Sequence, residues 1–327
     1  RDGVEVAKRL IARSDVVLEN FRPGVMERLG LGYDACRDLK RDIIFCSVSG
    51  YGQDGPMRDY PAIDNIVQAT SGLMSLQGEP DGDFMRIGFP AVDTYTGTLA
   101  ALAILAALVR RSVSGEGQRL DVSMLDAAMV LMASAAVPFL VTGKPLPRTG
   151  NTGYSGQPTA GMFRCRDGAR VSLGVVQPAQ FERLCGVLGR GDLLSDARFT
   201  TPDLRRANGA ELTAELALEF EKRDGADWER LLSEAGAPCG MMRDIAQGMN
   251  LPGLKERGVV APLNIDGLPG GGAVAAIGAG FVADRDGPRT DAPPPRLGEH
   301  TRAVLSELGY EAGDIEAMLA ARAAVQA

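Results

Sequence analysis

Histidine is almost absent from this sequence, and the other residues that build metal centres are sparse. His300 is the single histidine, and the five cysteines are scattered without a C-x-x-C pair. Multi-histidine metal centres are therefore excluded, and neither a zinc site nor a disulfide framework is indicated. A Ser-His-Asp triad would depend on His300 alone, whose setting in RLGEHTRAVLSELGY is more typical of the first turn of a terminal amphipathic helix.

Long hydrophobic runs and a basic excess are also lacking. The best apolar stretch, 98–109, has the length of a core helix rather than of a membrane span, and the opening RDGVEVAKRL has no signal-peptide features. The net charge of −7 gives no basic footprint for nucleic acid and little attraction to anionic membranes. We therefore expect a cytoplasmic protein with reduced thiols and with neither nucleic acid nor membrane as a partner.

The 327 residues, 45% of them hydrophobic, suffice for a large core and for more than one domain. Helical and extended patterns alternate in the first half, and this order predicts a parallel sheet covered by helices. The expected elements are helices at 4–12, 23–29, 33–39, 63–73 and 125–141, a long helix beginning near residue 93, and strands within SDVVLENF, RDIIFCSVSGYG and QRLDVSM.

The Gly-, Pro-, Ser- and Thr-rich segment TGKPLPRTGNTGYSGQPTAG interrupts this alternation and predicts an entry into a second domain. A hairpin around Asp167 and Gly168, helices to about Arg230, short β-like pieces at 251–283 and closing helices follow. We predict three parts: 1–147 as the first part of a large domain, 148–245 as linker and small domain, and 246–327 as a return linker and the C-terminal part of the large domain.

One carboxylate stands at a junction that matters chemically. In RIGFPAVDTYTGTLAALAIL, Asp93 lies where an extended segment passes into an apolar helix, so we expect both the helix and Asp93 to be buried. Free N–H groups and the helix dipole at such a start favour the ionised form. The residues alone leave two roles open: the commoner one is a helix cap, and the other is a nucleophile toward an activated acyl carbon.

Several motifs, in order along nearly the whole chain, resemble the class III CoA-transferase family, which includes formyl-CoA and carnitine-CoA transferases and related acyl-CoA racemases. The motifs are DVVLENFRPGVMERLGLGYD, SVSGYGQDGP, YPAIDNIVQATSGLM, VDTYTGTLAALAILAAL, GEGQRLDVSMLDA, GNTGYSGQP and PRLGEHT. The resemblance implies an α/β fold with a Rossmann-like large domain, a smaller α+β second domain and an interlocked homodimer.

The resemblance also implies a reaction and its site. CoA moves from an acyl-CoA donor to a small carboxylic acid through mixed anhydrides and a thioester on Asp93, with the CoA thioester as substrate and no permanently bound cofactor or metal. The implied active-site loop is Gly153, Tyr154, Ser155, Gly156 and Gln157, and the implied CoA contacts are Asn20, Phe21, Arg22, Arg28, Ala62, Ile63 and Asp64. Taken singly, Arg28 also fits a solvated helix charge, Phe21 a core residue, the loop an interdomain turn, and Asp64 a structural hydrogen bond.

Departures from the family pattern bear on the choice of reaction. Ile63 stands where the racemases use histidine, and Gln177 stands near their glutamate, so proton transfer by these positions is disfavoured. The sequence also starts later than the family does, at the helix before SDVVLENF. We expect either a fragment of a longer chain or a form that lacks part of its site, and a non-catalytic CoA-binding or scaffold subunit is the alternative function.

Overall fold

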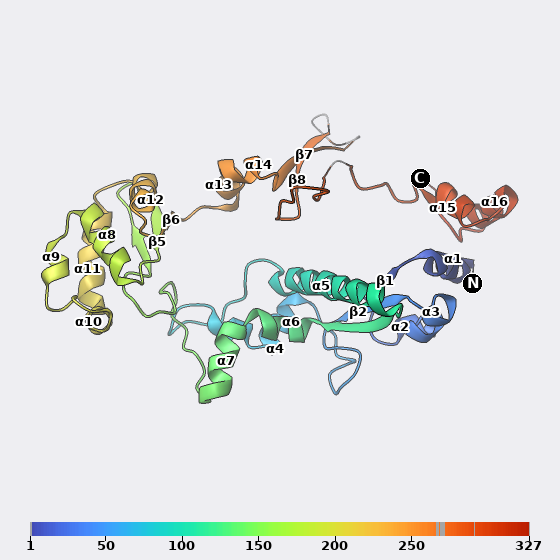
Figure 1. Cartoon of the computed structure of the whole chain (residues 1–327), viewed down its shortest axis with the longest axis horizontal. Coiled ribbons are helices and arrows are strands. Elements are labelled where there is room, and N and C mark those ends of the chain that lie inside the picture. The colour runs from blue at the N-terminus through green and yellow to red at the C-terminus, as the bar shows by residue number, and fades with distance from the viewer. Residues whose placement is uncertain (1, 266–267, 269–271, 291, 327) are drawn as a thin grey trace. The chain divides into compact units, whose positions relative to one another are not determined.

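The structure is a computed structural model that describes residues 2–265, 268, 272–290 and 292–326. The chain divides into two units, one of residues 1–148 with 295–327 and one of residues 149–294 (Figure 1). The first boundary lies one residue from the expected 147/148. In this division the residues at 246–294, where the return linker is expected, group with the second unit, and residues 295–327 group with the first.

The first unit alternates helices and strands and ends with two helices from the C-terminal segment. Its elements are α1 Asp2–Arg13, β1 Val16–Glu19, α2 Val25–Arg28, α3 Tyr33–Leu39, β2 Ile44–Ser49, α4 Asp64–Thr70, the 3-10 helix η1 Leu73–Leu76, α5 Ala91–Ser114, β3 Gln118–Ser123, α6 Met124–Leu131, α7 Ala133–Thr142, α15 Thr301–Glu307 and α16 Ala312–Ala320.

The three strands of this unit form the predicted parallel sheet in the order β1-β2-β3. Val16 pairs with Ile44, and Ile44 pairs in turn with Gln118. The central strand β2 is the most buried, as expected for a strand with a neighbour on each side and helices over its faces. Ile43 and Phe45 join Ile11, Met26 and Cys36 in a core beneath α1 and α3.

Helix α5 contradicts the expectation of a buried helix. It packs on β2, β3 and α6 and lies along the sheet in Figure 1, but only five of its residues are buried. Leu102, Leu105, Val109 and Val113 are between 59% and 88% exposed. An apolar composition indicates that a helix has apolar surface to bury. It does not show whether other residues of the same chain bury that surface.

Helix α5 is also longer than the 98–109 stretch considered for a membrane span. Its 24 residues include an 18-residue window of mean hydropathy 1.7, and α6 with α7 would pass as a second span if counted together. Asp93 lies in the first turn of α5 and Arg111 in the last, and one side of the helix rests on the sheet. This packing is that of a helix at the edge of a folded core.

The single helix expected at 125–141 is two helices. Met132, with φ −91° and ψ 14°, ends α6, and α7 continues at an angle of 80°. No residue of α7 is buried. Apolar periodicity alone could not reveal the break, because both halves are similarly hydrophobic.

The second unit is built on an antiparallel sheet with helices around it. Its elements are β4 Met162–Arg164, β5 Arg170–Leu173, α8 Pro178–Leu188, α9 Asp192–Ser195, α10 Pro202–Ala207, α11 Gly209–Phe220, α12 Gly225–Glu234, β6 Cys239–Met241, α13 Ile245–Met249, α14 Pro252–Glu256, β7 Val260–Asn264 and β8 Ala273–Ile277.

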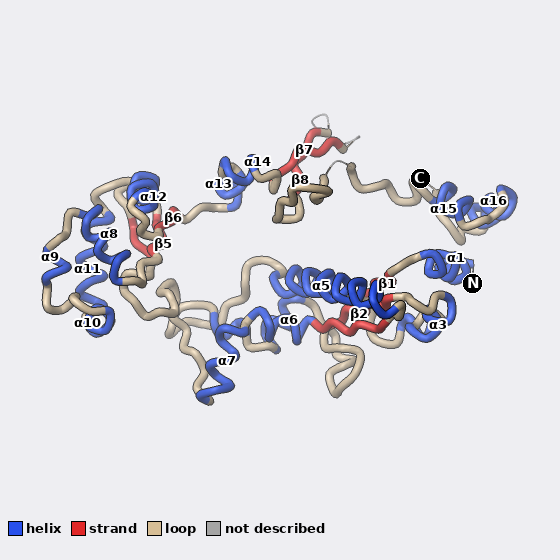
Figure 2. The backbone as a smooth tube through the Cα atoms, in the orientation of Figure 1, coloured by secondary structure: helices blue, strands red, loops and turns tan. Residues whose placement is uncertain are grey.

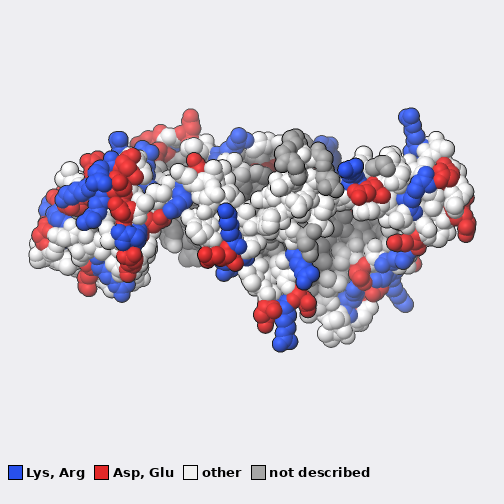
Figure 3. All heavy atoms as spheres, turned by 90° about the horizontal axis from the view of Figure 1, so that it is seen from above, with Lys and Arg blue, Asp and Glu red and all other residues white. Residues whose placement is uncertain are grey.

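The hairpin expected around Asp167 and Gly168 joins β4 to β5, and β6 completes this sheet. Phe163, Phe220 and Trp228 pack together in its core. The segment between α7 and β4 has neither helix nor strand, as its composition predicts (Figure 2). Acidic and basic side chains are interspersed over the surface of α8–α12 in Figure 3.

Candidate active site

Asp93 is the third residue of α5, and its side chain caps nothing. Pro90 occupies the N-cap position, and no side-chain hydrogen bond is made there. Asp93 is exposed, so the prediction of a buried carboxylate and the reading of Asp93 as a helix cap are both wrong. The helix instead begins beside another carboxylate, which leaves the Asp93 side chain available.

That carboxylate is Asp64, the first residue of α4. Its Oδ2 accepts hydrogen bonds from the backbone N–H of Val92 at 2.8 Å and of Asp93 at 3.1 Å. Asp64 therefore satisfies two of the free N–H groups at the start of α5 from a distant position in the sequence. The reading of Asp64 as a group that orients Asp93 is supported, and it acts through the backbone of Asp93.

Gln68 completes this arrangement from the next turn of α4. Its Nε2 donates to Asp64 Oδ1 at 2.5 Å, and its Oε1 accepts from the backbone N–H of Ile87 at 2.9 Å. Gln68 is fully buried. The backbone N–H of Ile87 can only donate, so it fixes the orientation of the Gln68 amide and requires Asp64 to be an acceptor at both oxygens. The segment before α5 and the nucleophile's own turn are held by one network.

The pKa of Asp93 is raised above its ordinary value. The larger cause is partial desolvation at the start of α5, and the second is the negative charge of Asp64. The expectation that the surroundings favour the ionised form is therefore wrong in sign. A more basic carboxylate is a better nucleophile once it is ionised, so the higher pKa suits covalent chemistry.

Asp93 lines a pocket of about 240 Å³ at the carboxyl ends of the parallel strands, which we term the β1–β2 pocket. Ligands of open parallel sheets commonly bind at this edge. The lining is Asn20, Phe21, Arg22, Pro23, Ser49, Gly50, Arg58, Tyr60, Ala62, Ile63, Asp93 and Met124. Five of the expected CoA contacts thus come together with the candidate nucleophile.

The wall of this pocket after β1 is held by two hydrogen bonds. Asn20 Nδ2 donates to the carbonyl of Val48 at 2.7 Å, and the backbone N–H of Phe21 donates to Glu19 Oε2 at 2.8 Å. Phe21 is 54% exposed, so it is not the core residue that its apolar side chain alone would suggest. Its exposed face is free to stack on a ligand.

Arg28 lies outside the lining but close to it. A Cβ added at Gly24 would lie 3.1 Å from Arg28 Nη1 and 3.4 Å from Arg58 Nη2, and Gly24 has φ 81°. Glycine is therefore favoured here by its conformation, and two guanidinium groups lie close to its Cα. Among the described residues, none pairs ionically with Arg22, Arg28 or Arg58. Sequence reasoning missed Arg58, whose Nε is buried without a hydrogen-bond partner.

A second pocket, of about 400 Å³, is also lined by this carboxylate and is termed the α4–α5 pocket. Its lining is Ile63, Asp64, Asn65, Gln68, Arg86, Ile87, Gly88, Phe89, Pro90 and Asp93. Asp93 and Ile63 belong to both pockets. Sequence reasoning missed Gln68, Asn65 and Arg86. The spacing of four residues between Asp64 and Gln68 was the one available signal, since it places both on one helix face.

The loop Gly153–Gln157, which the resemblance places in the active site, belongs to the second unit. It contributes to a pocket of about 530 Å³ with Ala160 and Ser172. Gln157 is buried and donates from Nε2 to the carbonyl of Pro202, whereas Tyr154 is fully exposed. Gln177 starts α8 in a capping box with Gln180, which is a structural role.

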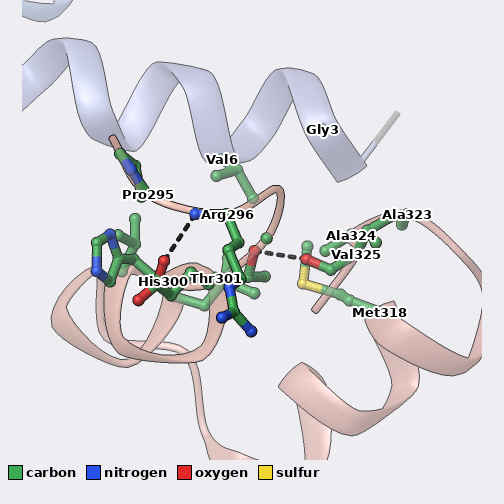
Figure 4. A pocket seen from close by; sticks show the side chains of 14 residues that line it. Gly3, Val6, Pro295, Arg296, His300, Thr301, Met318, Ala323, Ala324 and Val325 are labelled. Carbon is green, nitrogen blue, oxygen red and sulfur yellow. Dashed lines mark hydrogen bonds between the residues drawn. The ribbon is translucent and has the colours of Figure 1, made fainter. Parts of the chain in front are cut away.

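His300 lies far along the chain from these residues, beside α1. It is the N-cap residue of α15 without a side-chain capping bond, and it lines a cavity of about 410 Å³ with Val6, Arg296 and Met318 (Figure 4). Arg9 Nη1 donates to the carbonyl of Leu308 at 3.1 Å and so ties α1 to this segment. His300 thus lies at the start of a helix near the C-terminus, as the sequence indicates.

The five cysteines are free, and four of them are buried. Burial raises the pKa of the Cys46 thiol to about 11 and that of Cys185 to about 11, so these thiols are poor nucleophiles. Within the described ranges, no group of three or more metal-ligating side chains occurs. The chemistry that this part of the chain offers is that of a carboxylate between two pockets.

Comparisons with known proteins show the family of the chain. The sequence model of the family described as CoA-transferase family III matches residues 1–301. A succinate–glutarate CoA-transferase of Agrobacterium fabrum is 33% identical over 312 residues, which cover 94% of this chain and 76% of that protein. An acetyl-CoA:oxalate CoA-transferase of Acetobacter aceti is 33% identical over 299 residues, covering 91% and 75%.

A solved structure is similar across the same range. A CAIB/BAIF family protein from Brucella suis superposes with a TM-score of 0.81 at 32% identity, covering 94% of this chain and 79% of that chain. The expected mixed α/β fold with a parallel sheet is therefore confirmed.

Proposed function

The chain belongs to CoA-transferase family III, and from this premise we propose that it carries CoA from an acyl-CoA donor to a carboxylic acid as a thioester on Asp93. The observation that carries the proposal is the position of Asp93 in the lining of both pockets. One pocket offers exposed aromatic rings and arginines that pair with no acidic group in the described part of the chain, and the other offers space beside the carboxylate. An acyl-CoA thioester also has two parts that need space, because CoA is attached to one side of the reacting carbonyl and the rest of the acyl group to the other.

The proposed steps exchange one acyl bond for another. The Asp93 carboxylate attacks the donor thioester, which gives a mixed anhydride and CoA thiolate. The thiolate attacks the aspartyl carbonyl, which releases the donor acid and leaves aspartyl-CoA. The acceptor carboxylate then attacks this thioester and again forms an anhydride and free thiolate. Attack of the thiolate on the acceptor carbonyl yields the new acyl-CoA and restores Asp93.

We assign the β1–β2 pocket to CoA. Arg22, Arg28 and Arg58 are placed to meet phosphate groups by charge-assisted hydrogen bonds, and Phe21 and Tyr60 present aromatic faces for the adenine or the pantetheine arm. Asp64 and Gln68 position Asp93 through its backbone. CoA is a substrate in this scheme, and the proposal requires no resident cofactor.

The loop Gly153–Gln157 is assigned to the acylated intermediates on the strength of the resemblance and of the pocket that it lines in its own unit. A homodimer is proposed because α5 and α7 expose apolar faces that a second copy could cover. A cytoplasmic location is proposed because the five cysteines are unpaired.

The test is CoA transfer from succinyl-CoA and a panel of acyl-CoAs to carboxylic acids by the wild type, Asp93→Ala, Asp93→Asn and Asp126→Asn. Asp126 is a matched control, because it is the third residue of α6 as Asp93 is of α5, and it lines neither pocket. Both Asp93 variants should lose transfer while Asp126→Asn keeps it. Retained transfer by Asp93→Ala would contradict the mechanism.

Two alternatives give different results in the same preparation. CoA binding in calorimetry without any turnover would favour a non-catalytic CoA-binding or scaffold subunit. Incorporation of deuterium at the α-carbon of an acyl-CoA would favour a racemase, which the aliphatic Ile63 beside Asp93 disfavours.

A further inference from the structure

We infer that the α4–α5 pocket selects dicarboxylic acids, with Arg86 pairing the carboxylate that does not react. The inference rests on the proposed function of Asp93. It assigns a role to three residues that the family resemblance did not place in the site, namely Arg86, Asn65 and Gln68.

The first argument is charge. Arg86 is the only cationic side chain in the pocket's described lining, and it forms no ion pair with a described residue, although Asp64 and Asp93 line the same pocket. Asp64 is already occupied by two backbone N–H groups and by Gln68. An anionic acid entering beside two carboxylates is repelled, so a second carboxylate placed at Arg86 offsets the repulsion through a charge-assisted pair.

The second argument is anchoring. Arg86 directly precedes Ile87, whose backbone N–H is bound by the buried amide of Gln68. The same amide binds Asp64, which holds the backbone N–H of Asp93. The backbone beside Arg86 and the backbone of Asp93 are thus attached to one network, which sets the distance between the points from which the two side chains extend.

The third argument is an unsatisfied polar atom. Asn65 Oδ1 is buried and has no hydrogen-bond partner, and Asn65 lines this pocket. Buried polar atoms are nearly always satisfied, so this atom marks a side chain without a fixed partner. Oδ1 has no exposed surface in this position, so the inference requires the Asn65 carboxamide to turn into the pocket, where its Nδ2 donor suits a carboxylate oxygen.

The fourth argument separates this pocket from the CoA side. Arg22 and Arg58 line the β1–β2 pocket and match a ligand with several phosphates, whereas the α4–α5 pocket has one cation for one charge. A volume of about 400 Å³ is ample for a short dicarboxylic acyl group. The β1–β2 pocket therefore recognises the polyanionic CoA, and the α4–α5 pocket recognises an acyl group with a single charge.

The test compares glutarate with pentanoate, acids of equal chain length that differ by the second carboxylate. The quantity is the ratio of the two acceptors' kcat/KM values with succinyl-CoA as donor, because in a ping-pong reaction this ratio depends only on the half-reaction that starts from aspartyl-CoA. Arg86→Gln should lower the ratio by about 10- to 150-fold, and Arg86→Lys should recover part of the loss.

Two controls bracket this result. Arg41→Gln removes an exposed arginine outside both pockets and should leave the ratio unchanged. Arg58→Gln should raise the KM of the donor without changing the ratio. A ratio that stays within twofold in Arg86→Gln would overturn the inference while leaving transfer through Asp93 intact. Equal losses for both acids would assign Arg86 to the reacting carboxylate and would also overturn it.

A binding measurement covers the case in which turnover is too slow to compare. Glutarate is titrated calorimetrically into Asp93→Asn and into the Asp93→Asn, Arg86→Gln double variant. Glutarate should bind the single variant more tightly than pentanoate does, and the Arg86 change should remove that difference. Equal binding of the two acids by Asp93→Asn would refute the selection of dicarboxylic acids.

Discussion

The network that positions Asp93 can be tested by exchanging the carboxylate of Asp64 and the amide of Gln68, through Asp64→Asn, Gln68→Glu and the double variant. In Gln68→Glu, a second buried carboxyl group faces Asp64 at the place where Gln68 Nε2 now donates over 2.5 Å. While protonated, the introduced carboxyl group can still donate to Asp64 and accept from the N–H of Ile87, whereas its ionised form cannot donate. The pKa of this new group in the folded state should therefore rise above its unfolded value of about 4.3.

The sign of the pH dependence follows from this higher pKa. A raised pKa in the folded state means that the network is intact below about pH 4.3 and that stability is lost as pH rises to the folded-state pKa. A folded-state pKa that is higher by one corresponds to a loss of about 1.4 kcal/mol. A cost of about 2–4 kcal/mol at pH 8 is expected, relative to the wild type, for a buried carboxyl group of this kind.

Asp64→Asn should cost about 1–3 kcal/mol, since its amide would either direct a donor at the Gln68 donor or leave the N–H groups of both Val92 and Asp93 unpaired. The double variant Asp64→Asn, Gln68→Glu restores every hydrogen bond with the charge moved to position 68. Asparagine remains a good acceptor at a helix start. The double variant should lie within about 1.5 kcal/mol of the wild type, which gives a coupling of at least about 1.5 kcal/mol.

The assay is urea unfolding of the four proteins between pH 4.5 and pH 8.5, with CoA transfer measured in parallel. Transfer should recover in the double variant together with stability. Additive destabilisation at pH 8, or a Gln68→Glu cost that does not grow with pH, would refute the reasoning.

Four further outcomes are expected. Transfer should fall on the acid side at a higher pH than an ordinary aspartate would give, because the pKa of Asp93 is raised, as a pH profile of kcat/KM will show. Arg58→Gln should raise the KM of acyl-CoA about tenfold with little change in kcat. Gly24→Ala should lower stability by about 1–2 kcal/mol in urea unfolding, because its φ is 81° and its Cβ would meet Arg28. Leu105→Glu should yield monomers by light scattering if α5 lies in a homodimer interface, and an unchanged assembly would exclude this face.

Local periodicity predicted much of the first unit. The helix at 33–39 has the bounds that the sequence indicates, and the three strands pair in parallel as their alternation with helices predicts. Five of the expected CoA contacts converge on one pocket because loops that follow parallel strands meet at the same edge of the sheet.

The errors have a common physical cause. The apolar composition of α5 led to an overestimate of its burial, because composition does not show whether residues of this chain pack against all sides of a helix. The local sequence could not show that Asp64, 29 positions away, binds the N–H of Asp93, or that its charge raises the pKa of that group. Arg58 and Arg86 were missed for the same reason, since isolated arginines in loops have no local pattern that distinguishes them.

The central claim is that Asp93 becomes a thioester of CoA. Wild-type protein incubated with acyl-CoA and no acceptor should gain the mass of CoA less one water, and peptide mapping should place the adduct on the segment that contains Asp93. Hydroxylamine should remove the adduct, and Asp93→Asn should not form it. Transfer without this adduct, or an adduct on another residue, would contradict the account.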